Sequence, residues 1–268
     1  KARYALVVPA DAQRIEQKAA ADLRANLQMI CNAEFQIVSE AEAVADAGPF
    51  VSVGRTALLA GSRCKWKDAD LAAEGYAIEV AGDNVYLYGG TGRGLMNAAY
   101  SLLEEDLGCR WYSTTSVDTP RMDRLEVRLV PRKYVPVLEL RDPYILKMHD
   151  PTWSLRNKTN TPHARVPMSW GGSIRYHHMG HTYARYFPTE QYFAEHPEYY
   201  ALVNGKRQPS QLCHTNEDAI RLSIEKTLDI FRTYPEVTVT AIGPNDGRGF
   251  CDCPNCRKLD EENGGRSG

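Results

Sequence analysis

Short apolar strands alternate with an amphipathic helix at the start of the chain, and this alternation most constrains the fold. Residues 5–8 form an apolar strand-like run, and residues 12–30 carry apolar side chains at the spacing of one helix face. Asp11 stands where the N-cap of that helix is expected. Two further runs, at 35–38 and 50–54, are typical of strands. The alternation predicts an α/β domain with a helix against a sheet.

A hairpin and a glycine-rich connection follow. Residues 76–80 and 84–88 are predicted to be two strands around the turn sequence 81–83. The run 89–94 then leads into a helix predicted for 95–107. Its glycines do not have the spacing of a dinucleotide-binding loop, and no Lys-Ser/Thr pair follows. We therefore interpret this run as a tight strand-to-helix connection that needs positive φ angles, not as a phosphate site.

The second region, residues 133–268, has the pattern of consecutive β/α units. Its strands are predicted at 137–141, 176–181, 199–203 and 237–242, and its helices at 189–196 and 217–233. About four strands fit, whereas a closed (β/α)₈ barrel needs eight. The sequence thus predicts a small N-terminal α/β domain over 1–132, with a last strand at 125–130, followed by the first half of a TIM-type barrel. We expect the chain to be truncated and inactive by itself.

Asn245 and Asp246 follow the last predicted strand and are the clearest sign of chemistry. In β/α barrels, the side chains at the C-terminal ends of the strands form the active site. A carboxylate there acts as a general acid or base, or stabilises a developing cation. The alternative is an Asn-Asp-Gly turn without chemistry. Asp246 is accordingly the main catalytic candidate, with Asn245 beside it.

Three of the seven cysteines lie within six residues, at Cys251, Cys253 and Cys256. Thiolates at this spacing can converge on tetrahedral zinc, which needs a fourth ligand. Cys213 follows the neighbouring predicted strand and is the first candidate for that ligand, with His214 as the substitute. A disulfide or free thiols are the alternatives. We expect the four cysteines to come together, and the choice between structural zinc and a disulfide stays open.

Histidine and aromatic side chains of the second region are candidate sugar contacts. His178 and His181 belong to a run of three histidines whose spacing does not fit the helical H-E-x-x-H metal motif. Aromatic rings stack on sugar faces, and Trp170 and Tyr200 are candidates for this contact. We expect no cofactor to be required for catalysis. The net charge of -2 gives no reason to expect nucleic acid as a partner, and no apolar run is long enough to span a bilayer.

Several stretches resemble known families. The strand and helix that begin at Tyr4, and the segment 89–112, resemble the N-terminal domain of α-glucuronidases and the non-catalytic α/β domain of β-hexosaminidases. A second set resembles the bacterial family called domain of unknown function 4838; it comprises residues 196–202, 205–207, 211–213, 244–247 and 250–256. Some members of that family are grouped with family-163 glycoside hydrolases, which are endo-β-N-acetylglucosaminidases acting on complex N-glycans.

The resemblance implies a barrel whose fourth strand ends at Asn245 and Asp246. Hexosaminidase barrels carry an acidic pair there, of which one residue orients the acetamido group and the next donates a proton. Here the pair is Asn-Asp, so Asp246 takes one of these roles and a glutamate from a later strand is the expected partner. Arg141, followed by Asp142, resembles the sugar-contacting arginine of the first barrel strand.

These observations predict a glycoside hydrolase acting on N-acetylhexosamine-containing glycans. The alternatives are a catalytically silent carbohydrate-binding relative and a zinc-stapled structural module. The chain begins at Lys1 without a signal peptide of its own. We expect a bacterial protein that is exported to the periplasm or the cell surface.

Overall fold

The computed structural model describes residues 2–43 and 48–265, and the chain divides into two compact units. Unit 1 is Lys1–Ser173 and unit 2 is Ile174–Gly268. The division therefore lies some 40 residues beyond the predicted boundary at 132/133. It does so because residues 132–134 add a strand to the sheet of unit 1 and the segment that follows packs on the same unit. None of the described helices combines the length and the apolar character that crossing a membrane requires.

A six-stranded mixed sheet forms the centre of unit 1, with the strand order β2-β1-β3-β5-β4-β8. The strands are β1 (Ala5–Val8), β2 (Ile37–Ser39), β3 (Phe50–Val53), β4 (Tyr76–Ala81), β5 (Asn84–Gly89) and β8 (Arg132–Tyr134). The first four in this order are parallel, and β4 and β8 are antiparallel to their neighbours. The strands predicted at 5–8, 35–38, 50–54, 76–80 and 84–88 are confirmed, as are the β4–β5 hairpin and the α/β class.

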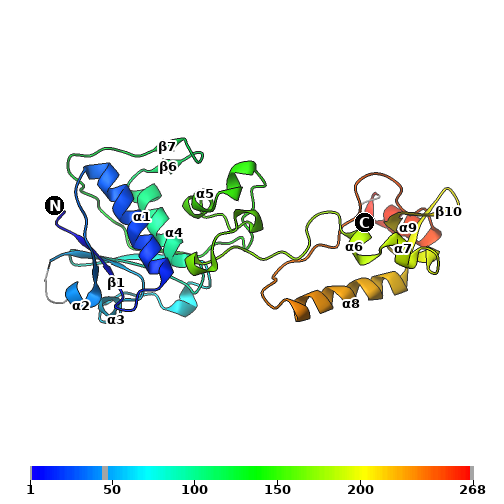
Figure 1. The fold of residues 1–268 in the computed structure, drawn as a ribbon, viewed down its shortest axis with the longest axis horizontal. Coiled ribbons are helices and arrows are strands. Elements are labelled where there is room, and N and C mark those ends of the chain that lie inside the picture. The colour runs from blue at the N-terminus through cyan, green and yellow to red at the C-terminus, as the bar shows by residue number, and fades with distance from the viewer. Residues whose placement is uncertain (1, 44–47, 266–268) are drawn as a thin grey trace. The chain divides into compact units, whose positions relative to one another are not determined.

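Two helices cover one face of this sheet and bury its main core (Figure 1). They are α1 (Arg14–Cys31) and α4 (Gly94–Ser101), the latter continued by a π-helical turn, η2 (Leu102–Asp106). The buried side of α1 carries the predicted apolar stripe, including Leu23, Leu27 and Ile30. Its N-cap is Gln13 and not Asp11, because the helix begins at Arg14. The remaining elements of unit 1 are short: α2 (Glu40–Ala43), α3 (Ala57–Ala60), η1 (Asp68–Asp70), β6 (Arg110–Trp111), β7 (Val117–Asp118), η3 (Leu146–His149), α5 (Pro151–Arg156), η4 (Pro162–Ala164) and η5 (Met168–Trp170).

The glycines between β5 and α4 are needed for close backbone packing and not for positive φ. Gly89, Gly90 and Gly94 all have ordinary φ values. A Cβ on Gly90 would lie 1.5 Å from the carbonyl oxygen of Ala72, and one on Gly94 would lie 2.1 Å from that of Gly75. The expectation of a tight connection is therefore correct, but its predicted cause was wrong.

Two predicted strands of unit 1 do not form. Residues 125–130 cross the core as an irregular strap, in which Leu125 and Leu129 pack on the core without pairing to a strand. Residues 137–141 are irregular too, because the backbone of Arg141 pairs with the side chain and backbone of Asn160 and not with a neighbouring strand. In the first segment Leu125 and Leu129 pack on the core, whereas Val137 and Leu138 of the second segment are exposed.

Unit 2 contains helices, an antiparallel hairpin and two irregular segments that run in parallel. Its elements are α6 (Tyr183–Tyr186), α7 (Thr189–Tyr192), η6 (Pro197–Tyr199), β9 (Tyr200–Val203), β10 (Lys206–Leu212), α8 (Glu217–Thr233) and α9 (Pro254–Asn263). Segments 175–182 and 237–243 lie side by side, with a parallel bridge between Tyr176 and Val239 and further backbone hydrogen bonds. They are two of the predicted barrel strands, but they do not form continuous strands.

The third predicted strand of the second region pairs differently from a barrel strand. β9 forms a hairpin with β10 around Asn204 and Gly205, and among the described residues it does not pair with either parallel segment. The described residues of unit 2 thus show one parallel neighbour pair and one hairpin. The half-barrel is not confirmed, and the assignment of 133–268 to a barrel stays a prediction.

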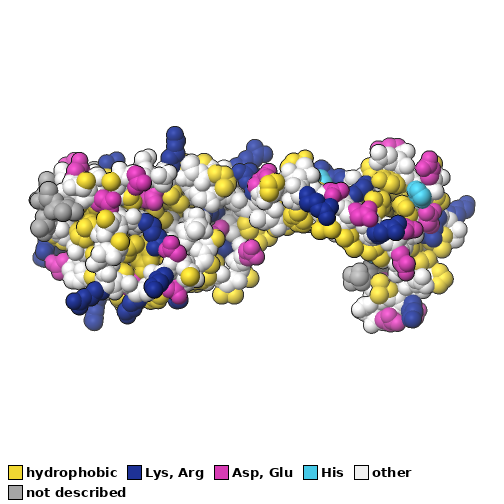
Figure 2. Space-filling model, turned by 90° about the horizontal axis from the view of Figure 1, so that it is seen from below, with side chains coloured by type: hydrophobic (Ala, Val, Ile, Leu, Met, Phe, Trp, Pro, Cys, Tyr) yellow, Lys and Arg dark blue, Asp and Glu magenta, His cyan; other side chains and the backbone are white. Residues whose placement is uncertain are grey.

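Helix α8 follows its prediction and has two apolar sides. Ala219, Leu222 and Ile230 pack in the aromatic core of unit 2. A second row of large apolar side chains is exposed: Ile220, Ile224, Leu228 and Phe231. Figure 2 shows hydrophobic side chains at the surface of this part of the chain among charged ones.

Candidate functional site

The loop that carries Asp246, residues 243–250, is fixed at its start by Thr182. The Thr182 hydroxyl is fully buried, donates to the carbonyl of Ala241 at 3.0 Å and accepts from the amide of Gly243 at 2.9 Å. The Thr182 amide donates to the carbonyl of Gly243 at 3.0 Å. We call residues 243–250 the Asp246 loop. Three hydrogen bonds therefore hold its entry against the segment 175–182.

The middle of the Asp246 loop is held by β10. The Gln211 side-chain amide donates to the carbonyl of Asn245 at 2.6 Å, and the Asn245 amide donates back to Gln211 Oε1 at 3.0 Å. The Asn245 side chain donates to the carbonyl of Ser210 at 2.7 Å. Asn245 is thus engaged in anchoring the loop, and its catalytic role stays a prediction.

Asp246 presents its carboxylate to solvent beside a histidine. Its side chain is 93% exposed, and its Oδ2 atom lies 3.5 Å from His181 Nε2. The other ring nitrogen, His181 Nδ1, lies 2.7 Å from the carbonyl of Pro244, to which it donates. That bond leaves Nε2 directed at Asp246, where it carries a proton only when the ring is charged. The pair can hold a proton between an imidazole nitrogen and a carboxylate.

His178 lies in an aromatic cluster of the same unit. Its ring is 4.1 Å from that of His177 and 5.8 Å from that of Tyr186. Burial lowers the pKa of His178, and the charges of His177 and Arg185 lower it further. Its Nδ1 is buried and has no hydrogen-bond partner among the described residues. The arrangement keeps a neutral imidazole close to the segment that bears His181.

The four cysteines of the second region converge, as predicted. The sulfurs of Cys213, Cys251, Cys253 and Cys256 all lie within 4.8 Å of one another, and all four residues are buried. Cys213 Sγ is 3.8 Å from Cys253 Sγ and 3.8 Å from Cys256 Sγ, so the cysteines are close without being bonded. His214, the substitute ligand, is outside this group, because its Nε2 pairs with the Tyr183 hydroxyl at 3.0 Å.

Charge on one sulfur of the cluster is stabilised by its surroundings. Burial raises the pKa of Cys253, but hydrogen bonds from the Cys256 amide and the Thr215 hydroxyl outweigh it and lower that pKa overall. Cys253 is also the N-cap of α9, whose first turn has a partial positive charge.

Three predicted substrate contacts are engaged elsewhere. Tyr200 is 2% exposed and its hydroxyl donates to the carbonyl of Phe187 at 3.0 Å, so it is a core residue and not a sugar contact. Arg141 belongs to unit 1, where its guanidinium pairs with Glu74 and donates to the carbonyl of Lys158. Trp170 is also in unit 1, half-buried against its core, with the Lys18 ammonium 5.0 Å from its ring.

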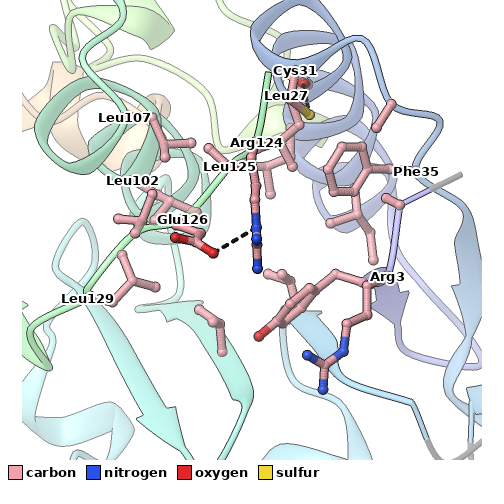
Figure 3. Close-up of a pocket in the computed structure, with 18 of the residues that line it drawn as sticks. Arg3, Leu27, Cys31, Phe35, Leu102, Leu107, Arg124, Leu125, Glu126 and Leu129 are labelled. Carbon is pink, nitrogen blue, oxygen red and sulfur yellow. Dashed lines mark hydrogen bonds and ion pairs between the residues drawn. The ribbon is translucent and has the colours of Figure 1, made fainter. Parts of the chain in front are cut away.

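A cavity in unit 1 contains no candidate catalytic residue. It has a volume of about 560 Å³ and lies between α1, the sheet and the strap 125–130 (Figure 3). Leu102, Leu107 and Leu129 line it, and Arg124 and Glu126 form an ion pair of 2.7 Å beside it. Because its lining is largely apolar, we interpret this cavity as a packing gap beneath the strap 125–130.

Sequence reasoning missed the residues that anchor the site. Thr182 and Gln211 bond to a loop more than 30 residues away, and no local pattern marks such contacts. For Thr215 the sequence offers one signal, its position two residues after Cys213; in the structure its hydroxyl lies 3.3 Å from Cys256 Sγ.

Both parts of the sequence match described families. Residues 111–268 match the family described as domain of unknown function (DUF4838), and residues 1–104 match glycosyl hydrolase family 20, domain 2. The first match covers more than half of the chain, so the chain belongs to the DUF4838 family. The resemblance inferred from the motifs is thereby confirmed.

A comparison with solved structures matches a family GH115 4-O-methyl-α-glucuronidase, BtGH115A, described as specific for decorated arabinogalactans. It is 10% identical in sequence, with a TM-score of 0.48, and the alignment covers 85% of this chain and 40% of that one. The chain thus spans less than half the length of that enzyme. A search of curated proteins found no match.

Proposed function

We propose that this protein is a glycoside hydrolase that cleaves glycans containing N-acetylhexosamine. The finer proposal is an endo-acting β-N-acetylglucosaminidase. The domain of glycosyl hydrolase family 20 over residues 1–104 supports the general class, since it belongs to glycosidases. The residue-level resemblance around Asp246 supports the choice of sugar.

The observation that carries the proposal is the exposed carboxylate of Asp246 on an anchored loop. Thr182 and Gln211 fix the backbone on its N-terminal side, while the Asp246 side chain itself bonds to no backbone group of the described residues. A carboxylate used only to cap a turn would be bonded to nearby amides. Asp246 is instead available to a ligand, with His181 as its neighbour.

The proposed chemistry is proton donation to the glycosidic oxygen or support of the substrate's own acetamide. Glycoside hydrolysis passes through an oxocarbenium-like transition state, and in family-20 enzymes the substrate acetamide replaces the protein nucleophile. Asp246 would then orient that acetamide or act as the acid. His181 would supply or hold the proton that Asp246 needs, because its Nδ1 is committed to Pro244 and its Nε2 faces the carboxylate.

A panel of glycans tests the proposal. Complex N-glycans, chitooligosaccharides and glucuronic-acid-bearing glycans are incubated with the full-length protein, and the products are identified by mass spectrometry. We expect cleavage next to N-acetylglucosamine and none of the glucuronidated substrates. Cleavage of a substrate without N-acetylhexosamine would refute the choice of sugar, and no cleavage of any glycan would refute the enzyme.

A carbohydrate-binding relative without activity is the second candidate. The 93% exposure of the Asp246 side chain favours it, because general acids usually work where burial raises their pKa. Calorimetry on the same panel separates the two. Binding of a glycan that stays intact after prolonged incubation supports the second candidate and contradicts the first.

A further inference from the structure

We propose that Cys213, Cys251, Cys253 and Cys256 bind one zinc ion in a closed, four-thiolate structural site. The site lies wholly within unit 2, in a small core that also includes Ala201. The proposal does not depend on the glycosidase proposal, because it concerns the stability of the unit and not its chemistry.

The spacing of the sulfurs fits tetrahedral zinc. With Zn–S bonds of about 2.3 Å, the edges of a regular tetrahedron are about 3.8 Å long. The distances from Cys213 Sγ to Cys253 Sγ and to Cys256 Sγ are both 3.8 Å. The longest separation within the group is at most 4.8 Å, which is about 1 Å beyond this edge length. All four ligands required for a structural site are thus already together.

A second set of contacts surrounds the sulfurs with hydrogen-bond donors. The amide of Leu202 lies 3.3 Å from Cys251 Sγ, and the amide of Cys256 lies 3.5 Å from Cys253 Sγ. The Thr215 hydroxyl lies 3.3 Å from Cys256 Sγ. Neutral thiols packed as small apolar side chains do not need such donors, whereas metal-bound thiolates are commonly oriented by them.

The alternative of disulfides fits the geometry less well. A disulfide joins two sulfurs at about 2.05 Å and leaves the other two to pair separately. Here Cys213 is equally distant from two partners, so no pairing is singled out. Equal Sγ–Sγ distances from one cysteine to two others are expected when all of them bind the same metal ion.

The zinc would tie three elements together. Cys213 directly follows β10, Cys251 directly follows the Asp246 loop, and Cys253 and Cys256 are the N-cap and a first-turn residue of α9. With four protein ligands the metal has no open position, so its role is structural and not catalytic. It would fix the far side of the Asp246 loop, which Thr182 and Gln211 hold at its start and middle.

Metal analysis of the purified full-length protein tests the proposal. We expect one zinc per chain by mass spectrometry of the native protein, and a tetrahedral thiolate spectrum after exchange with Co²⁺. Zinc-free preparations that stay metal-free when Zn²⁺ is added would overturn the proposal. So would two disulfides among these four cysteines in a protein purified without added oxidant.

Variants supply the matched comparison. Cys256→Ser should lower zinc content and the Tm of unit 2, whereas Cys31→Ser, in α1 of unit 1, should change neither. If Cys256→Ser fails to fold, a zinc chelator is added to the wild-type protein instead. A Tm that falls with the chelator and recovers with Zn²⁺ supports the site, and a Tm unaffected by complete removal of the metal refutes it.

Discussion

Gln211 and Asn245 are joined by a reciprocal pair of hydrogen bonds, 2.6 Å and 3.0 Å long, between a buried side chain and the backbone beside Asp246. The side-chain NH₂ and oxygen of Gln211 therefore both find their partners on the backbone of Asn245. The backbone beside Asp246 is therefore held from β10, by a residue 34 positions before Asn245.

Replacing Gln211 should loosen the Asp246 loop. In Gln211→Ala, two backbone groups of Asn245 lose their partner, which typically costs about 1–3 kcal/mol when the groups are buried. Hydrogen exchange over residues 243–250 should accelerate, and the free energy of unfolding should fall. The control is Gln208→Ala, at an exposed position of the same strand. Equal exchange in the two variants would show that Gln211 does not anchor the loop.

Replacing Gly90 should destabilise unit 1. A Cβ at this position would meet the Ala72 carbonyl oxygen at 1.5 Å, so the β5–α4 connection must move. Overpacking of this kind costs about 1–3 kcal/mol or more. Chemical denaturation should show this loss for Gly90→Ala and a much smaller change for Gly61→Ala, whose Cβ would make ordinary contacts. Similar midpoints for both variants would contradict the close-approach explanation.

His178 should make unit 2 sensitive to acid. Burial, followed by the charges of His177 and Arg185, lowers its pKa in the folded protein below the ordinary value of 6.5. Between the lowered pKa and 6.5, the unfolded chain binds more protons than the folded chain, so the free energy of unfolding falls as the pH falls through this window. His178→Gln should flatten that dependence.

The matched control for this measurement is His149→Gln, at an exposed position of unit 1. Denaturation curves at several pH values between 7 and 5 compare the two variants with the wild-type protein. A slope in His178→Gln as steep as in the wild type would mean that other groups cause the acid sensitivity.

Local patterns predicted most of unit 1 and the helix α8. The β4–β5 hairpin and the amphipathic α1 have strong periodic signals, and each buries the face that its pattern indicates. The strap at 125–130 has the same alternation as a strand. It does not become one because its apolar side chains pack on the core while no strand pairs with its backbone.

Unit 2 was harder to predict, because its order depends on contacts between distant segments. The β9–β10 hairpin had a readable signal in Asn204-Gly205, whose φ values of 50° and 76° are those of a primed hairpin turn. This hairpin was not predicted, because the segment was interpreted as one strand of a repeating β/α unit. Spacing grouped Cys251, Cys253 and Cys256, and Cys213 was added because it follows the neighbouring predicted strand; the four sulfurs do come together. No local sequence pattern indicates the hydrogen bonds from Thr182 and Gln211.

The kinetic effect of removing the Asp246 carboxylate tests the central claim most directly. On a glycan that the wild-type protein cleaves, Asp246→Ala should lower kcat/KM by roughly 10²-fold or more, the usual size for a positioned acid–base group. Asp229→Ala removes an exposed carboxylate from α8 in the same unit and should leave kcat/KM unchanged. An Asp246→Ala protein that folds normally and retains wild-type kcat/KM would contradict the account.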